Sequence, residues 1–147
     1  MARSRPLFYR QETPYSCVPA CLRMVLAGFG LDLAEAALRT LCDCTLFGTH
    51  ALKAVDATRR LGFPNTAKHT LAGDELEALV NNGNYPIVFV ATLPIEGLKG
   101  EHAMVVIACD QVNVVVYDPL RGERRLPRTL FDTAWAMMHN LAILVQR

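Results

Sequence analysis

The sequence predicts an α+β fold, in which helices from the first half of the chain pack on a mostly antiparallel sheet from the second half. Apolar residues recur at helical spacing in the first half, and runs rich in valine and isoleucine fill the second. Few helical segments separate those runs, so successive strands pair antiparallel and helices lie against the sheet. A chain of 147 residues is long enough to bury a core as a single domain, residues 1–147.

Four helices are expected before the strand-rich half. The first begins at Cys17, where Ser16 is a candidate cap and Pro19 is tolerated in the first turn. Gly28 and Gly30 then end this helix. The other three are expected at Leu33–Leu41 with Asp32 as cap, from Thr49 to Gly62, and at Asp74–Val80 before a turn at residues 81–84.

In the second half of the chain the spacing of apolar residues changes from helical to strand-like. Strands are expected at Pro86–Thr92, His102–Cys109 and Val112–Tyr117. Only Asp110 and Gln111 separate the last two, which predicts a hairpin. The chain then continues into a helix near Leu130–Met138 and a closing strand at Leu141–Val145.

The charge balance is typical of an ordinary globular protein. The net charge is +1, 52% of residues are hydrophobic and 20% are charged. Nucleic-acid binding draws on clustered and uncompensated lysine and arginine, so no nucleic-acid partner is expected. Four arginines do crowd one predicted loop, where we expect them to face acidic partners: Arg121, Arg124, Arg125 and Arg128.

The sequence predicts no direct membrane insertion. The most apolar segment, Val18–Phe29, is about a dozen residues long and carries Arg23, which favours a core helix. No signal peptide is recognisable near the start of the chain. Five cysteines, an odd number, do not indicate a disulfide framework. Reduced thiols and a cytoplasmic location are therefore expected.

Three residues distant in sequence have the chemistry of a thiol-based acyl-transfer site. Cys17 lies in the first turn of a helix, where the positive end of the macrodipole favours the nucleophilic thiolate. His102 opens one predicted strand, and Asp118 closes the next. A cysteine, a histidine and an orienting carboxylate commonly come together from distant stretches of chain.

Around these residues the chain resembles the bacteriocin-processing, double-glycine leader peptidases, a papain-like group of cysteine peptidases. No single motif carries the resemblance, but their order and spacing together are specific. The matching parts are Gln11, the run Cys17-Val-Pro-Ala-Cys-Leu-Arg-Met-Val-Leu up to Gly30, His102-Ala-Met-Val-Val-Ile, Val116-Tyr-Asp-Pro-Leu-Arg-Gly and Phe131–Trp135.

The resemblance implies a role for four residues. Cys17 would be the nucleophile, His102 its general base and Asp118 the group that orients the imidazole. Gln11 would supply a side-chain N–H to the oxyanion hole. The chemistry agrees, since a glutamine amide and the Cys17 backbone N–H at a helix start provide two donors. In papain-type sites the histidine and cysteine form an imidazolium–thiolate pair.

The resemblance also implies a partner. The substrate would be a small precursor peptide with a leader, and many family members are joined to a membrane transporter, so a separate membrane exporter is a possible partner. Two positions depart from the family pattern, which has an acidic residue before the cysteine and glycine after it. Here they are Ser16 and Val18, and Val18 places a branched side chain beside the nucleophile.

Each of these residues also has an ordinary structural explanation. An isolated cysteine is often a small core hydrophobe, and His102 suits a strand end. Asp118 precedes a proline in a predicted turn, and Asp-Pro commonly opens turns. A glutamine in a loop, like Gln11, usually has no function. Two functional alternatives follow: a non-catalytic leader-peptide-binding module of the same fold, or an amidase or acyltransferase that uses the same triad.

The remaining cysteines indicate no cofactor. Cys21 lies one helical turn after the proposed nucleophile and Cys109 within a strand, so both are expected in the core. Cys42 and Cys44, with His50 nearby, invite a metal interpretation. Structural zinc sites need four ligands, generally as two spaced pairs, and this group has fewer. Neither a metal nor another cofactor is expected.

Overall fold

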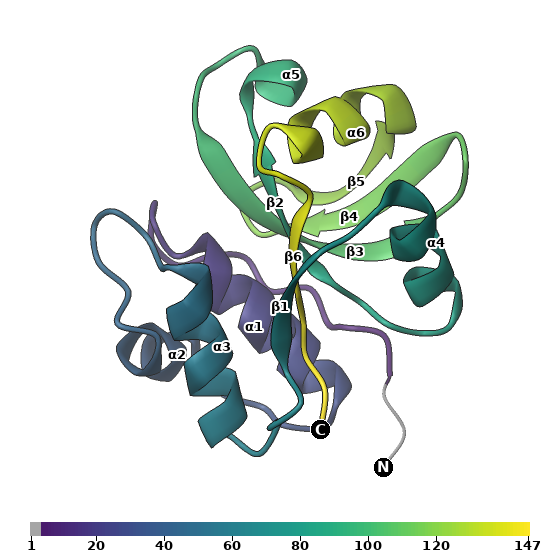
Figure 1. Ribbon diagram of the computed structural model, residues 1–147. Helices are drawn as coiled ribbons and strands as arrows, with labels where there is room; N and C mark the ends of the chain where they lie inside the picture. The colour runs from purple at the N-terminus through teal and green to yellow at the C-terminus, as the bar shows by residue number, and fades with distance from the viewer. Residues whose placement is uncertain (1–3) are drawn as a thin grey trace.

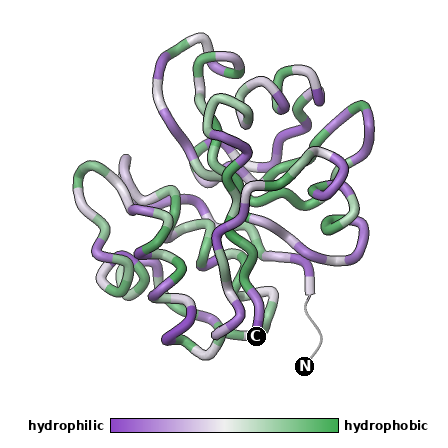
Figure 2. The backbone as a smooth tube through the Cα atoms, in the orientation of Figure 1, coloured by the Kyte–Doolittle hydropathy of each residue, from purple (hydrophilic) through white to green (hydrophobic). Residues whose placement is uncertain are grey.

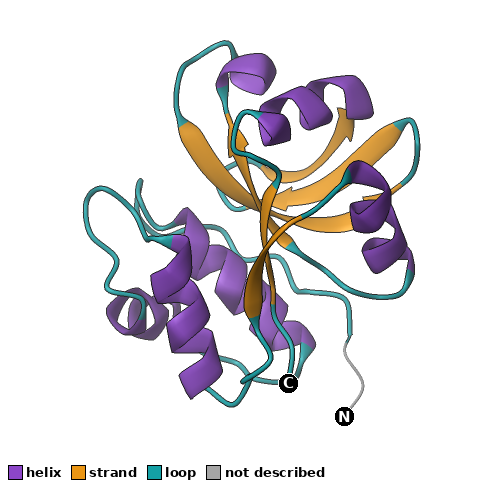
Figure 3. Cartoon of the chain, in the orientation of Figure 1, coloured by secondary structure: helices purple, strands orange, loops and turns teal. Residues whose placement is uncertain are grey.

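The computed structural model describes residues 4–147 as a six-stranded sheet with helices on both faces (Figures 1 and 3). The helices are α1 (Cys17–Gly28), α2 (Glu35–Leu41), α3 (Ala51–Arg60), α4 (Gly73–Asn81), α5 (Leu93–Glu96) and α6 (Arg128–Ala136). The strands are β1 (Ala67–Thr70), β2 (Ile87–Ala91), β3 (Glu101–Cys109), β4 (Asn113–Asp118), β5 (Gly122–Pro127) and β6 (Leu141–Leu144). The predicted α+β class is confirmed.

Every neighbouring pair in the sheet is antiparallel, in the order β1-β6-β2-β3-β4-β5. The predicted hairpin between β3 and β4 is present, and Val105 faces Tyr117 across it. Its turn is held by the Asp110 carboxylate, which accepts hydrogen bonds from the backbone N–H groups of Val112 (2.8 Å) and Asn113 (2.7 Å). The hairpin brings the start of β3 beside the end of β4, where two of the proposed site residues lie.

Alternation along the central strands divides the core into two layers. On β3, Ala103, Val105 and Ile107 face the core shared with α1–α3, whereas Met104 and Val106 face the core shared with α4 and α6. The tube through these strands is largely hydrophobic (Figure 2). The N-terminal helices therefore pack on the sheet as predicted, and α4 and α6 cover its second face.

Two predicted helix caps are wrong. Ser16 occupies the N-cap position of α1, but its hydroxyl makes no capping bond and instead pairs with Thr13 and Glu35. Asp32 does not cap the second helix, because α2 begins only at Glu35 after extended backbone at Ala34. A distant partner, Glu35, thus holds the Ser16 side chain away from its expected local role, whereas Asp32 lies too far before the helix to cap it.

The arginine-rich stretch forms β5 rather than a loop. Its burial alternates along the strand, with Arg124 half-buried and Arg125 exposed. The expected acidic partners are present: Arg121 and Arg124 pair with Glu96, and Arg128, at the start of α6, pairs with Glu77 and Asp132. Charged residues at strand spacing lack the apolar face from which strands are recognised.

Candidate active site

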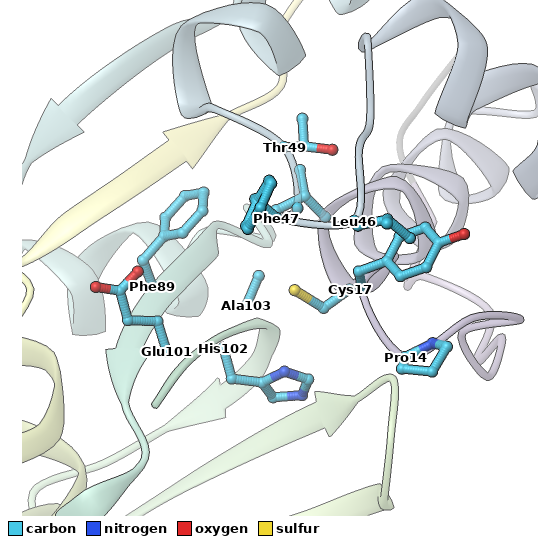
Figure 4. A pocket seen from close by; sticks show the side chains of 12 residues that line it. Pro14, Cys17, Leu46, Phe47, Thr49, Phe89, Glu101, His102 and Ala103 are labelled. Atoms are coloured by element: carbon cyan, nitrogen blue, oxygen red, sulfur yellow. The ribbon is translucent and has the colours of Figure 1, made fainter. Parts of the chain in front are cut away.

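Cys17 and His102 border one pocket, between the start of α1 and the start of β3 (Figure 4). The first hydrogen bond of α1 joins the Ala20 N–H to the Ser16 carbonyl (3.1 Å). The backbone N–H of Cys17 therefore lies in the first turn, outside the helix's own ladder and available to a ligand. The thiol is half-buried, with its sulfur on the pocket wall.

His102 and Asp118 are joined directly across the β3–β4 hairpin. The imidazole Nε2 lies 2.7 Å from Asp118 Oδ1, which leaves Nδ1 as the ring nitrogen available to the Cys17 thiol. Asp118 is 1% exposed and its oxygens accept three further hydrogen bonds. These come from the backbone N–H groups of Leu120 (2.9 Å) and Arg121 (3.3 Å) and from the guanidinium of Arg124 (3.2 Å).

The pKa of His102 reflects these contacts. Burial lowers the pKa of the imidazole, but hydrogen bonds to Asp118 and Cys17, and the negative charge of both groups, raise it to about 9. Burial in turn raises the pKa of Asp118, yet the bonds and charge of His102, the Leu120 N–H and Arg124 bring it below its ordinary value. An imidazolium held against a carboxylate is therefore the favoured state at neutral pH.

Gln11 reaches the same site from the N-terminal segment. Its backbone N–H donates to the carbonyl of Pro119 (2.8 Å), which ties the glutamine to the turn that follows Asp118. The side chain is 9% exposed, and its amide nitrogen donates one hydrogen bond to the Thr13 carbonyl (2.8 Å). Among residues 4–147 the second amide hydrogen has no acceptor, so it can donate to a bound group.

A buried carboxylate fixes the loop between Gln11 and Cys17. Glu35, 0% exposed, accepts hydrogen bonds through Oε1 from the Glu12 backbone N–H (2.9 Å) and the Ser16 hydroxyl (3.2 Å). Its other oxygen pairs with Arg39 (3.3 Å). One carboxylate oxygen therefore holds the residue that follows Gln11 and the residue that precedes Cys17.

Two hollows flank the imidazole. The first, of about 280 Å³, is lined by Cys17 and His102 together with aromatic and small residues that include Tyr15, Phe47 and Phe89 (Figure 4). Val18 borders this hollow but is 3% exposed, so most of its side chain packs in the core. The second hollow, of about 230 Å³, is discussed below.

The other cysteines have different surroundings. Cys21 and Cys109 are buried in the core, as expected, and burial raises the pKa of both thiols. Burial likewise raises the pKa of Cys42 to about 12. Cys44 is half-exposed, and its sulfur lies 3.7 Å from the carbonyl oxygen of Tyr15. Within residues 4–147, no three histidine, cysteine or acidic side chains are grouped in a way that suits a metal ion.

The comparison with known proteins agrees with this geometry. The sequence model of the Peptidase C39 family matches residues 7–147. The chain belongs to the Peptidase C39 family. This C39 chain is 28% identical over 131 residues to the lactococcin-G-processing and transport ATP-binding protein LagD of Lactococcus lactis subsp. lactis. The match covers 89% of this chain but only 18% of the length of LagD.

Solved C39 structures have the same fold. The peptidase domain of Streptococcus ComA, a bifunctional ABC transporter involved in a quorum-sensing pathway, is 26% identical with a TM-score of 0.73, covering 95% of this chain and 98% of the other. A double glycine motif protease from an AMS/PCAT transporter, solved in complex with the leader peptide, is 18% identical with a TM-score of 0.77, covering 99% and 95%. This second likeness concerns the fold alone.

The predicted resemblance to bacteriocin-processing, papain-like cysteine peptidases is thereby confirmed, and membership of C39 places the chain among cysteine peptidases. The structure places the four predicted site residues around two hollows that share His102: Cys17 lines the first, and Gln11 and Asp118 line the second. Sequence reasoning missed the contact of Arg124 with Asp118, and it missed Glu35, which bonds the residues next to Gln11 and Cys17. Nothing in an amphipathic helix or a charged strand distinguishes a buried acid or base from an exposed one.

Proposed function

We propose that this chain cleaves the leader from a small precursor peptide through a covalent thioester on Cys17. The observation that supports this most strongly is that Cys17 and His102 line one pocket, while the other side of the imidazole lies 2.7 Å from the Asp118 carboxylate. A nucleophile, its base and an orienting carboxylate are the three parts of such a site. The roles are then Cys17 as nucleophile, His102 as general base and acid, and Asp118 as the orienting group.

In the first step the Cys17 thiolate attacks the carbonyl carbon of the scissile peptide bond, and the carbonyl oxygen becomes an oxyanion. The free amide hydrogen of Gln11 and the N–H of Cys17 supply two donors for that oxygen. The C–N bond then breaks as His102 gives its proton to the departing nitrogen. The leader remains on sulfur as a thioester, and the amine product leaves.

In the second step a water molecule hydrolyses the thioester. Neutral His102 accepts a proton from the water while its oxygen attacks the acyl carbon, and the C–S bond breaks to return the thiolate and the imidazolium. Asp118 stays ionised throughout and holds the ring so that one nitrogen faces the sulfur.

The choice of a leader-bearing substrate is supported by the relatives. LagD is described as lactococcin-G-processing, and the structural neighbour from the AMS/PCAT transporter is a double glycine motif protease in complex with a leader peptide. We extend this substrate class to the present chain. We also propose that residues 1–147 work as one domain and that a membrane exporter receives the product.

A cytoplasmic location is part of the proposal. All five cysteines are free, which suits a reducing compartment. The described helices, those within residues 4–147, include none long and apolar enough to cross a bilayer.

The test is cleavage of a synthetic double-glycine leader peptide, followed by mass spectrometry. We expect two fragments that sum to the substrate plus one water, and we expect Cys17→Ala to bind the same peptide without cutting it. An intact peptide in which a side-chain amide has exchanged ammonia for water, giving a carboxylic acid, would indicate an amidase instead. Equal binding with no cleavage by either protein would overturn the peptidase and favour a leader-binding module.

A further inference from the structure

The second hollow lies on the other side of His102 from the thiol. Of the proposed site residues it is lined by Gln11, His102 and Asp118 but not by Cys17, whereas the first hollow is lined by Cys17 and His102. The imidazole is thus the partition between two halves of one cleft. Pro14 and Glu101 line both halves, so the two hollows adjoin and an extended peptide can lie across them.

The chemistry assigns a direction to that peptide. The acyl half of the substrate stays bonded to sulfur and so occupies the side where Cys17 is exposed. The departing nitrogen receives its proton from His102 and must leave along the imidazole, away from the sulfur. Accepting the function proposed above, we propose that the second hollow binds the side chain of the first residue after the scissile bond, and that it selects an apolar side chain.

The preference for an apolar residue follows from the ion pairs that the charged residues lining the hollow already make within the protein. The acids there are largely neutralised within the protein: Asp118 by His102 and Arg124, and Glu96 by Arg121 and Arg124. Charges that already satisfy one another offer little to a charged ligand.

Part of the accessible surface of the hollow is apolar. Ile95, Leu98 and Leu120 line it, and Leu98 is 72% exposed while Leu120 is 47% exposed. Covering such side chains removes apolar area from water and strengthens binding. Glu101, at the rim, has no ion-pair partner among residues 4–147 and disfavours an acidic residue there.

The size of the hollow suits one side chain. Its volume of about 230 Å³ is below the range of roughly 300–1,000 Å³ typical of small-molecule pockets. A leucine or isoleucine of the product peptide fits this description better than a separate ligand does.

The experiment uses one double-glycine leader peptide with Leu, Ala or Asp as the residue after the two glycines. We expect kcat/KM for the Leu peptide to exceed that for the Ala peptide by about tenfold. The Asp peptide should be the poorest substrate. Equal kcat/KM for the three peptides would overturn this inference but would not contradict the proposed peptidase function.

A pair of variants locates the effect. Leu98→Asp should reduce the Leu-to-Ala ratio to near one while the Ala peptide is still cut. Leu93→Asp is the matched control, because Leu93 is an exposed leucine on α5 that borders a neighbouring hollow instead, and its ratio should stay as in the wild type. The same loss in both variants would overturn the assignment of the hollow. Failure of the wild type to cut any peptide would overturn the proposed function and, with it, this inference.

Discussion

The imidazole of His102 and the carboxylate of Asp118 lie 2.7 Å apart, although the two residues are 16 positions apart in sequence. Asp118 is almost inaccessible to water, and the backbone N–H groups of the following turn hold it in place. This contact orients the ring and leaves Nδ1 as the nitrogen available to the Cys17 thiol across the shared pocket. The chemical behaviour of the site depends on this contact.

The first prediction concerns alkaline pH. Because the pKa of His102 is raised to about 9, kcat/KM should fall as the pH rises through that value and the imidazolium loses its proton. The free energy of unfolding should fall over the same range. Because the pKa of His102 in the folded protein lies above its ordinary value of 6.5, the protonated imidazole stabilises the fold fully below about pH 6.5. This contribution is lost as the pH rises through about 9. Thermal unfolding from pH 6 to 10 measures it, and His102→Ala should remove this part of the dependence.

The second prediction concerns Arg124, which bonds the side of Asp118 opposite His102. Arg124→Gln should raise the pKa of both Asp118 and His102, because an opposing cation near the carboxylate is removed. The pH–rate profile should move to higher pH as a whole. Arg125→Gln, one residue along β5 on its exposed side, is the control and should leave the profile in place. An Arg124→Gln profile that falls in height without moving would contradict this role.

The third prediction concerns thiol reactivity. At mildly acidic pH iodoacetamide should modify Cys17 well before Cys21, Cys42 and Cys109, whose thiols are buried and have raised pKa values. Peptide mapping by mass spectrometry identifies the modified residue. His102→Ala should slow the reaction of Cys17 and leave the others unchanged. Slow and uniform alkylation of all five cysteines would rule out an activated thiol.

The fourth prediction concerns Glu35 as a positioning residue. Its carboxylate holds Glu12 and Ser16, so Glu35→Gln should lower kcat by about tenfold with little change in KM. Gln11→Ala should cost about 3 kcal/mol of transition-state stabilisation, a typical value for one oxyanion donor. If Glu35 acts by placing Gln11, the double variant should be no slower than Gln11→Ala alone.

Controls for Glu35→Gln distinguish a loss of active-site positioning from a loss of folding stability. Breaking a buried ion pair is often strongly destabilising, so the melting temperature of Glu35→Gln must be measured beside its kcat. Ser16→Ala removes only one of the two bonds and should produce a smaller change of the same kind. Glu75→Gln alters an acid that caps α4, away from the cleft, and should leave kcat unchanged. Fully additive effects of Glu35→Gln and Gln11→Ala would contradict the coupling.

Much of this architecture could be predicted from the sequence, because its strongest signals are periodic. The apolar spacing of α1 and the alternation of the β3–β4 hairpin both follow from which face is buried. The two ends of that hairpin and the start of α1 also carry the site residues, so the same patterns locate His102, Asp118 and Cys17.

What could not be predicted depends on tertiary partners. β1 is four residues long, and only its pairing with β6 makes it a strand. The hydroxyl of Ser16 has a local role available at the helix start but bonds Glu35, 19 residues away. Arg124 belongs to a charged stretch whose partners, Glu96 and Asp118, become neighbours only when the sheet forms. Such contacts have no periodic signature.

The placement of the thiol on α1 and of the imidazole and carboxylate on β3 and β4 has a consequence for synthesis on the ribosome. Cys17 is synthesised early, whereas His102 and Asp118 follow only after most of the chain has been made. On the mechanism proposed above, a nascent or truncated chain that lacks β3 and β4 carries Cys17 without His102 and Asp118. The order of the elements along the chain thus delays assembly of the proposed site until β4 has been synthesised.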